Sequence, residues 1–193
     1  MKTVWISGLA LALVAVPALA DNERGFYAGL GTGVVSGRDH TPYEDARMPV
    51  LELAGGYKYN GLLGLEVRAG VGIKEDDDSE SYYFRDEQEN NSGLSEIERE
   101  VDQFYGVYYR PELINQSARL YGLIGYAELD TTVTRWEGNS STEQTESVSG
   151  GSYGLGAGWY VNERVNFNIE YRQLVNADDQ RFEALTIQWD YRF

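Results

Sequence analysis

The sequence predicts an all-β protein: an eight-stranded antiparallel up-and-down transmembrane β-barrel. In segments of about ten residues, apolar and polar residues alternate with a period of two, as in strands whose two faces differ. The face opposite the apolar row is rich in glycine, and the N-terminus has the pattern of an export signal. The negative mean hydropathy is compatible with a membrane protein, because only alternate residues of a barrel strand meet lipid.

The N-terminal segment has the composition of a signal peptide. Lys2 precedes an apolar run from Val4 to Val16, and the segment ends in a small-x-small motif at Ala18-Leu19-Ala20. The run is too short for a transmembrane helix and is typical of a segment cleaved after Ala20. We therefore expect residues 1–20 to be a signal peptide and residues 21–193 to form one outer-membrane β-barrel domain.

Composition narrows the function classes. The chain carries 31 acidic and 16 basic residues, and its net charge of −15 argues against nucleic acid as a partner. It has no cysteine, so barrel closure has to supply the stability that disulfides give many exported proteins. No cofactor is expected.

Four strands are expected in the first half of the chain, at residues 25–35, 50–59, 63–74 and 101–110. The third shows the clearest alternation, with Leu63, Leu65, Val67, Ala69, Val71 and Ile73 opposite Gly64, Glu66, Arg68, Gly70, Gly72 and Lys74. A tight turn at Asn60-Gly61 joins the second strand to the third. Residues 36–49 and the acidic stretch 75–100 are expected to be loops.

Four more strands are expected at residues 119–129, 153–161, 165–172 and 181–193. Both faces of the strand at 119–129 contain apolar residues, so its facing stays open. Residues 111–117 form a connector, residues 130–149 a Ser/Thr-rich loop, residues 162–164 a turn and residues 176–180 a short loop. Short connections alternate with longer loops, as in outer-membrane barrels with both chain ends in the periplasm.

The hairpin at residues 153–172 indicates which face is inside. Its alternation also fits a soluble sandwich or a lipocalin-like barrel. However, Gly154, Gly156 and Gly158 oppose its apolar row. Glycines weaken a solvent-facing strand, whereas inside a narrow barrel they leave room for long charged side chains of neighbouring strands. We therefore expect the apolar rows to face lipid.

Several motifs point to a known family. They are Gly25-Phe26-Tyr27-Ala28-Gly29, Tyr121-Gly122-Leu123-Ile124-Gly125-Tyr126, Tyr153-Gly154-Leu155-Gly156-Ala157-Gly158, Glu170-Tyr171-Arg172 and Trp189-Asp190-Tyr191-Arg192-Phe193. Over essentially the whole mature chain, the sequence resembles the eight-stranded outer-membrane barrels related to the membrane domain of OmpA and to OmpX. The resemblance implies a lumen that conducts ions weakly or not at all. No peptidoglycan-binding domain like that of OmpA is expected after the barrel.

Charged residues are expected to pair inside the lumen. An eight-stranded barrel is filled by side chains, and its low local dielectric penalises lone charges. This favours an ion-pair plug over a gated pore, with a weak ion-conducting small porin as the alternative. The expected members of the plug are Glu52, Lys58, Glu66, Arg68, Glu170 and Arg172.

Aromatic residues are expected at the two membrane interfaces. Trp159 and Tyr171 lie near strand ends, where membrane barrels carry an aromatic girdle. Trp189, Tyr191 and Phe193 belong to the outward row of the last strand. A terminal Phe with alternate aromatics before it resembles the signal that the barrel-assembly machinery reads.

The acidic loop offers weak candidates for a metal site. Asp76, Asp78, Glu80 and Glu87 partly match the spacing of an EF-hand, but Ser81 stands where that loop needs glycine. A solvated acidic loop is favoured, because most charge runs are simply solvated. Bridging of these carboxylates to lipopolysaccharide phosphates by divalent ions is the alternative.

An enzyme of the lipid A-modifying class is the least favoured alternative. His40, Asp78 and Ser79 are a His/Asp/Ser set in two loops, which resembles the palmitoyltransferase barrel in residue types and loop placement. The sequence shows no amphipathic helix before the first strand, and the expected lumen is charged where an acyl chain needs an apolar pocket. A lone loop histidine is usually an ordinary surface residue.

These observations predict a non-enzymatic outer-membrane barrel with a structural or surface-interaction role, in envelope integrity or adhesion. The expected partners are outer-membrane lipid and lipopolysaccharide, the barrel-assembly machinery during biogenesis, and an extracellular ligand that contacts the loops at 75–100 and 130–149. A monomer is expected.

Overall fold

The computed structural model describes residues 24–38, 46–60, 62–73, 81–83, 94–137, 140–177 and 180–193. The regular elements in these ranges are β1 (Gly25–Arg38), β2 (Ala46–Lys58), β3 (Gly64–Gly72), β4 (Ser81–Tyr83), β5 (Leu94–Tyr109), β6 (Glu112–Ile114), β7 (Ala118–Glu137), β8 (Ser140–Tyr160), β9 (Val165–Ala177) and β10 (Gln180–Arg192). Among the described residues, no helix has the length and apolarity that crossing a membrane requires.

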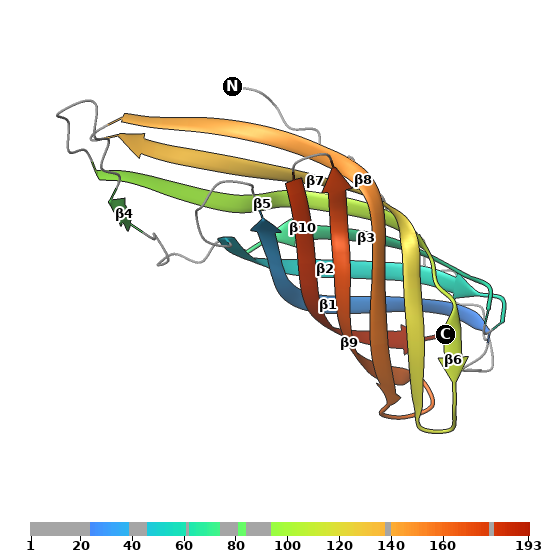
Figure 1. Ribbon diagram of the computed structural model, residues 1–193. Coiled ribbons are helices and arrows are strands. Elements are labelled where there is room, and N and C mark those ends of the chain that lie inside the picture. Colours follow the sequence, from blue (N-terminus) through green and yellow to red (C-terminus); the bar gives the residue numbers. More distant parts are fainter. Residues whose placement is uncertain are drawn as a thin grey trace.

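The strands form a closed antiparallel barrel (Figure 1). Its members follow chain order through β1, β2, β3, β5, β7, β8, β9 and β10. The ring closes because β10 pairs with β1, where Tyr27 lies opposite Arg192. The short strands β4 and β6 pair with β5 and β7 and add no strand to the ring. The predicted eight-stranded up-and-down barrel is confirmed.

Three short connections, at residues 59–63, 115–117 and 161–164, lie at one end of the barrel, which we call the turn end. Each is stabilised by an asparagine that accepts two backbone hydrogen bonds. For Asn60 Oδ1, the donors are the N–H groups of Leu62 at 2.9 Å and Leu63 at 2.8 Å. Asn115 and Asn162 make the corresponding bonds in the other two turns. Asparagine favours such turns because its side chain can bond to nearby backbone.

At the opposite end, which we call the extended end, β5, β7 and β8 run past the other strands (Figure 1). The prediction of a Ser/Thr-rich loop at 130–149 was therefore wrong: β7 continues to Glu137 and β8 begins at Ser140. Threonine suits a strand, and Thr132 and Thr145 face each other with their hydroxyl oxygens 3.1 Å apart.

The other predicted loops are also shorter than expected. Strand β1 continues to Arg38 and β2 begins at Ala46, so less of the segment 36–49 connects them. The segment 75–100 contains β4 and the beginning of β5. At 176–180, the neighbouring strands extend to Ala177 and from Gln180. Strand pairing thus continues well beyond the hydrophobic alternation that identified the strands.

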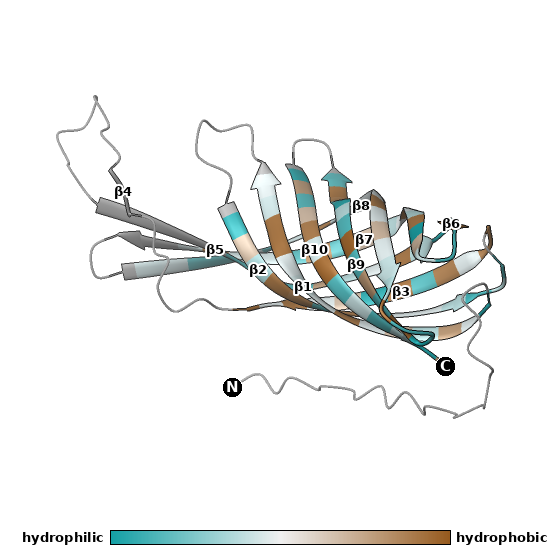
Figure 2. Cartoon of the chain, turned by 90° about the horizontal axis from the view of Figure 1, so that it is seen from below, coloured by the Kyte–Doolittle hydropathy of each residue, from teal (hydrophilic) through white to brown (hydrophobic). Residues whose placement is uncertain are grey.

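Exposed and buried residues alternate along the strands, which separates a lipid-facing row from a lumen row. Figure 2 shows hydrophobic and hydrophilic residues following one another along the same strands. On β3, Leu65 is 59% exposed, while Glu66 is fully buried. On β7, Leu120 and Ile124 face outward, and Leu123 is buried. This settles the strand whose facing the sequence left open.

Close packing explains the glycines of the 153–172 hairpin. An added Cβ would lie 2.2 Å from the Tyr121 ring at Gly156, and 2.3 Å from Asn168 Oδ1 at Gly158. The glycines therefore leave room for side chains of neighbouring strands, as predicted. These side chains include the charged Arg119, whose Nε lies 2.9 Å from the Cβ position at Gly158, but also the uncharged Tyr121 and Asn168.

Candidate functional site

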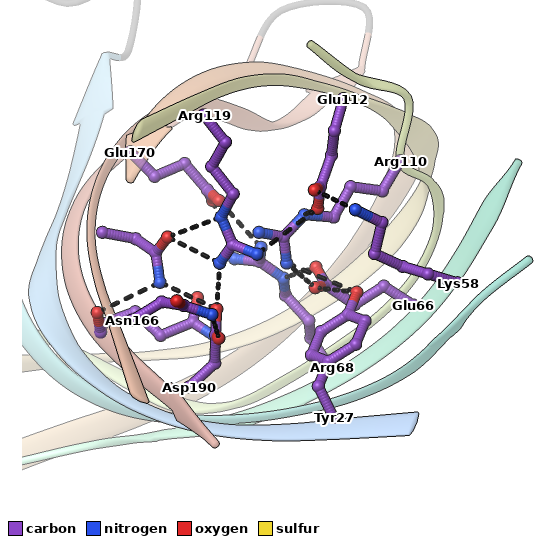
Figure 3. Close-up of polar contacts among 12 residues, drawn as sticks. Tyr27, Lys58, Glu66, Arg68, Arg110, Glu112, Arg119, Asn166, Glu170 and Asp190 are labelled. Atoms are coloured by element: carbon purple, nitrogen blue, oxygen red, sulfur yellow. Dashed lines mark hydrogen bonds and ion pairs between the residues drawn. The ribbon is translucent and has the colours of Figure 1, made fainter. Parts of the chain in front are cut away.

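The centre of the lumen is occupied by the guanidinium group of Arg68, on β3 (Figure 3). It makes a bidentate pair with Glu170 of β9, with N···O distances of 2.7 and 2.8 Å. Its Nε donates to Glu66 at 2.6 Å, and Nη1 donates to Glu52 at 2.7 Å. One planar cation thus joins carboxylates from three strands, an arrangement that suits the fixed donors of arginine.

Two further arginines neutralise these carboxylates. Arg172 pairs with Glu52 through Nη2, and its Nη1 lies 3.5 Å from Glu170. Arg110 pairs with Glu66, whose Oε2 also accepts a 2.6 Å hydrogen bond from the Tyr27 hydroxyl. The network therefore consists largely of charge-assisted bonds among buried groups, with few carboxylate oxygens left unsatisfied.

Nearer the turn end, the carboxylates of Glu112 and Asp190 each contact several basic or amide side chains. Glu112 pairs with Lys58, and its Oε1 lies 3.1 Å from Arg110 Nε. Arg119 Nη1 lies 3.6 Å and Arg192 Nη2 lies 3.8 Å from the same carboxylate. Asp190 pairs with Arg119 and accepts bonds from the amides of Asn166 and Asn168, at 2.6 and 2.9 Å. These groups continue the network of Arg68 toward the turn end.

All six expected lumen residues are buried, and all except Lys58 meet around Arg68. Lys58 instead pairs with Glu112. Five further charged residues of the lumen were not among those expected there: Arg110, Glu112, Arg119, Asp190 and Arg192. The last two alternate with the aromatic row of β10, so the same alternation indicates them. Arg110 and Glu112 flank Pro111, which suggested a connector, and Arg119 belongs to the strand of open facing.

The aromatic residues form a lipid-facing row near the turn end. The ring centroids of Trp159 and Phe167 are 6.1 Å apart, and those of Phe167 and Trp189 are 4.9 Å apart. Tyr191 and Phe193 continue the group, with centroids 5.2 Å apart. Tyr171 does not join this row. It pairs with Leu155 and Leu185, further toward the extended end of β9.

The extended end carries a second candidate surface, the three-stranded sheet of β5, β7 and β8 beyond the ring. Pairing of β8 with β9 begins at Gly151, so within the described chain residues 140–150 pair only with β7. Acidic side chains are exposed on this sheet and at its base. They are Asp102, Glu128, Glu143 and Glu146.

Several sequence candidates lie outside the described residues. These are His40 and Ser79 of the enzyme alternative and Asp76, Asp78, Glu80 and Glu87 of the metal alternative. Within the described ranges, no group of three or more acidic or histidine side chains is arranged to hold a metal ion.

Known proteins share this fold at low sequence identity. Ail of Yersinia pestis, solved with the heparin analogue sucrose octasulfate, is 17% identical, with a TM-score of 0.58 over 89% of this chain and 99% of Ail. Neisserial surface protein A is 15% identical, with a TM-score of 0.55 over 90% of this chain and 100% of the neisserial protein. OprG of Pseudomonas aeruginosa is 11% identical, with a TM-score of 0.54 over 91% of this chain and 99% of OprG.

No curated protein matches the sequence. The model of the outer membrane protein beta-barrel domain, however, matches residues 6–193. The closed barrel, its lipid-facing apolar rows and this match agree with one another. The chain belongs to the outer membrane protein beta-barrel domain family and is a protein of the outer membrane.

Proposed function

We propose that the protein is a non-enzymatic surface-interaction barrel that binds a positively charged partner through the sheet at its extended end. In outer-membrane barrels the longer connections face the outside of the cell, which places the extended end there. The observation that carries the proposal is the edge of β8 at residues 140–150, which pairs with β7 alone within the described chain.

An unpaired edge offers main-chain N–H and C=O groups to an added strand. The side chains along this edge are polar and exposed, and they include Glu143 and Glu146. Antiparallel pairing of two identical edges centred between Gln144 and Thr145 would put Glu143 of one copy opposite Glu146 of the other. Like charges directly opposite are destabilising, so the edge disfavours a second copy of itself and favours a basic segment.

Charge argues against a ligand of the kind found with Ail. Sucrose octasulfate is a polyanion, whereas this chain has a net charge of −15 and an acidic extended end. Like charges repel a polyanion over the distance of a Debye length. A basic, extended peptide segment is therefore the expected class of partner.

The test uses the barrel embedded in lipid nanodiscs and a peptide of alternating Lys and Thr. We expect binding that weakens with salt, is lost in Glu143→Lys with Glu146→Lys, and is unchanged in Glu163→Lys, an exposed position at the turn end. The same peptide with alternate N-methyl groups should bind poorly, because it cannot pair as a strand. Binding of sucrose octasulfate but not of the peptide would refute the proposal.

The absence of enzymatic activity is tested separately. We expect the lipid A profile of cells to be the same with and without the gene. A lipid A species that disappears on deletion and returns with the wild-type gene, but not with His40→Ala, would establish the enzyme alternative instead.

A further inference from the structure

Beyond the ion pairs, buried apolar side chains fill the lumen on the side of the extended end. We call this group the apolar layer. Every barrel strand except β3 contributes to it, and all of its side chains are buried. Its members are Val35, Met48, Val50, Val101, Phe104, Ala127, Leu129, Val148, Leu174, Val175, Phe182 and Ala184.

The apolar layer and the ion-pair network lie in series along the barrel. On β2, Val50 and Met48 lie one and two lumen positions closer to the extended end than Glu52. On β9, Leu174 and Val175 follow Arg172 in the same direction. Any path from the extended end through the lumen therefore meets the apolar layer first.

A glycine on β3 and a bulge on β9 allow the side chains of the apolar layer to pack in the lumen. Strand β3 adds no side chain to the layer but carries Gly70 opposite Phe104; an added Cβ there would lie 2.1 Å from the Phe104 ring, so the glycine leaves room for this ring. On β9, the register shifts relative to both neighbours at Leu174 and Val175, and both side chains are fully buried. A regular strand would turn one of the two outward, whereas a bulge turns both into the lumen.

We propose that the apolar layer, rather than the ion-pair network, is the barrier that stops ions and polar solutes entering from the extended end. A charged network can exchange its partners for a passing ion or for water. An apolar constriction offers no ligand, stays dry, and makes an ion lose its hydration without compensation. This barrier role is independent of the binding proposed for the β8 edge.

The chain contains no cysteine, so a single introduced thiol reports accessibility. Thr186 is buried in the lumen, opposite Gly33 and Glu170, two residues beyond Ala184 of the layer. In intact cells that express the Thr186→Cys variant, a charged, membrane-impermeant thiol reagent added to the outside should not label the introduced cysteine. Ser147→Cys, at an exposed position of β8, should label fully in every background and serves as the positive control.

Opening the layer should expose this thiol. With Phe104→Ser and Phe182→Ser, we expect labelling of Thr186→Cys to rise from background toward the Ser147→Cys level, and the purified barrel to conduct in planar bilayers. Phe104→Leu with Phe182→Leu should stay closed. If the serine variant does not fold, as judged by gel mobility before and after boiling, Leu129→Ser with Val148→Ser removes a pair opposite each other on β7 and β8.

The matched comparison opens the network and leaves the layer intact. Glu52→Gln with Arg172→Gln replaces one ion pair by neutral side chains, and we expect neither labelling nor conductance. Labelling or conductance in this variant would overturn the proposal. So would folded serine variants that remain closed.

Discussion

Arg68 and Glu170 form a bidentate ion pair across the lumen although they lie 102 residues apart in the chain. Their strands, β3 and β9, are not neighbours in the ring. The pair therefore links opposite walls of the barrel in a way that no strand ladder can.

Removing Arg68 should be strongly destabilising. Arg68→Met leaves the carboxylates of Glu52, Glu66 and Glu170 with fewer cations in a buried site, and breaking such pairs typically costs about 3–5 kcal/mol. Urea unfolding in lipid vesicles, followed by tryptophan fluorescence, measures the loss. Arg47→Met, at an exposed position of β2, is the control and should change stability little. Equal losses in the two variants would contradict a structural role for the network.

Two glycines should respond differently to the same methyl group. In Gly70→Ala the new Cβ collides with the Phe104 ring, and overpacking of this kind costs about 1–3 kcal/mol. At Gly55 nothing lies within 4 Å of an added Cβ, so Gly55→Ala should be nearly neutral. The same unfolding assay compares them. Adding Phe104→Leu should recover part of the Gly70→Ala loss, and an additive double variant would argue against direct contact between the two positions.

The row that contains Trp159 and Trp189 should lie at a membrane interface. Trp136→Phe leaves these two as the tryptophans of a chain that has lost residues 1–20. In vesicles of brominated lipids, we expect bromine near the headgroup to quench their fluorescence more than bromine near the acyl-chain end, because tryptophan prefers the interface. Stronger quenching by the deep bromine would place the row in the hydrocarbon core and contradict its assignment as a girdle.

The protein isolated from outer membranes should begin at Asp21. Mass spectrometry of the intact protein checks the cleavage after Ala20, and Ala20→Lys should accumulate the uncleaved precursor, because the position before the cut requires a small residue. A mature protein that retains Met1 would show that the N-terminal segment is not a cleaved signal.

Alternation was sufficient to predict the strands, and the glycines opposite the apolar row of the 153–172 hairpin indicated that they form a narrow barrel with that row facing lipid. The lumen positions of Glu52, Glu66 and Arg68 follow from the same pattern, because a period of two assigns every second residue to one face. The alternation could not show which acidic side chain pairs with which basic side chain. The Arg68–Glu170 pair depends on the diameter of the closed barrel, and that diameter depends on strand number and stagger.

The outer parts of the strands were harder to predict. Residues 131–137 and 140–146 pair along their full length, yet they consist mainly of Thr, Ser and Glu and lack the apolar alternation that identified the other strands. The apolar layer was missed for a different reason. Leu174 and Val175 both enter the lumen through a bulge, which breaks the alternation on which the assignment relied.

The register of Tyr27 with Arg192 joins the first strand of the barrel to its last. Until β10 has been synthesised and exported, β1 has β2 as its only neighbour in the ring. A partly delivered chain therefore exposes two unpaired strand edges, which are prone to aggregate. Contacts between residues so far apart in sequence also form slowly. The periplasm must keep this chain unfolded until it is complete, so factors that hold unfolded polypeptides should determine its yield.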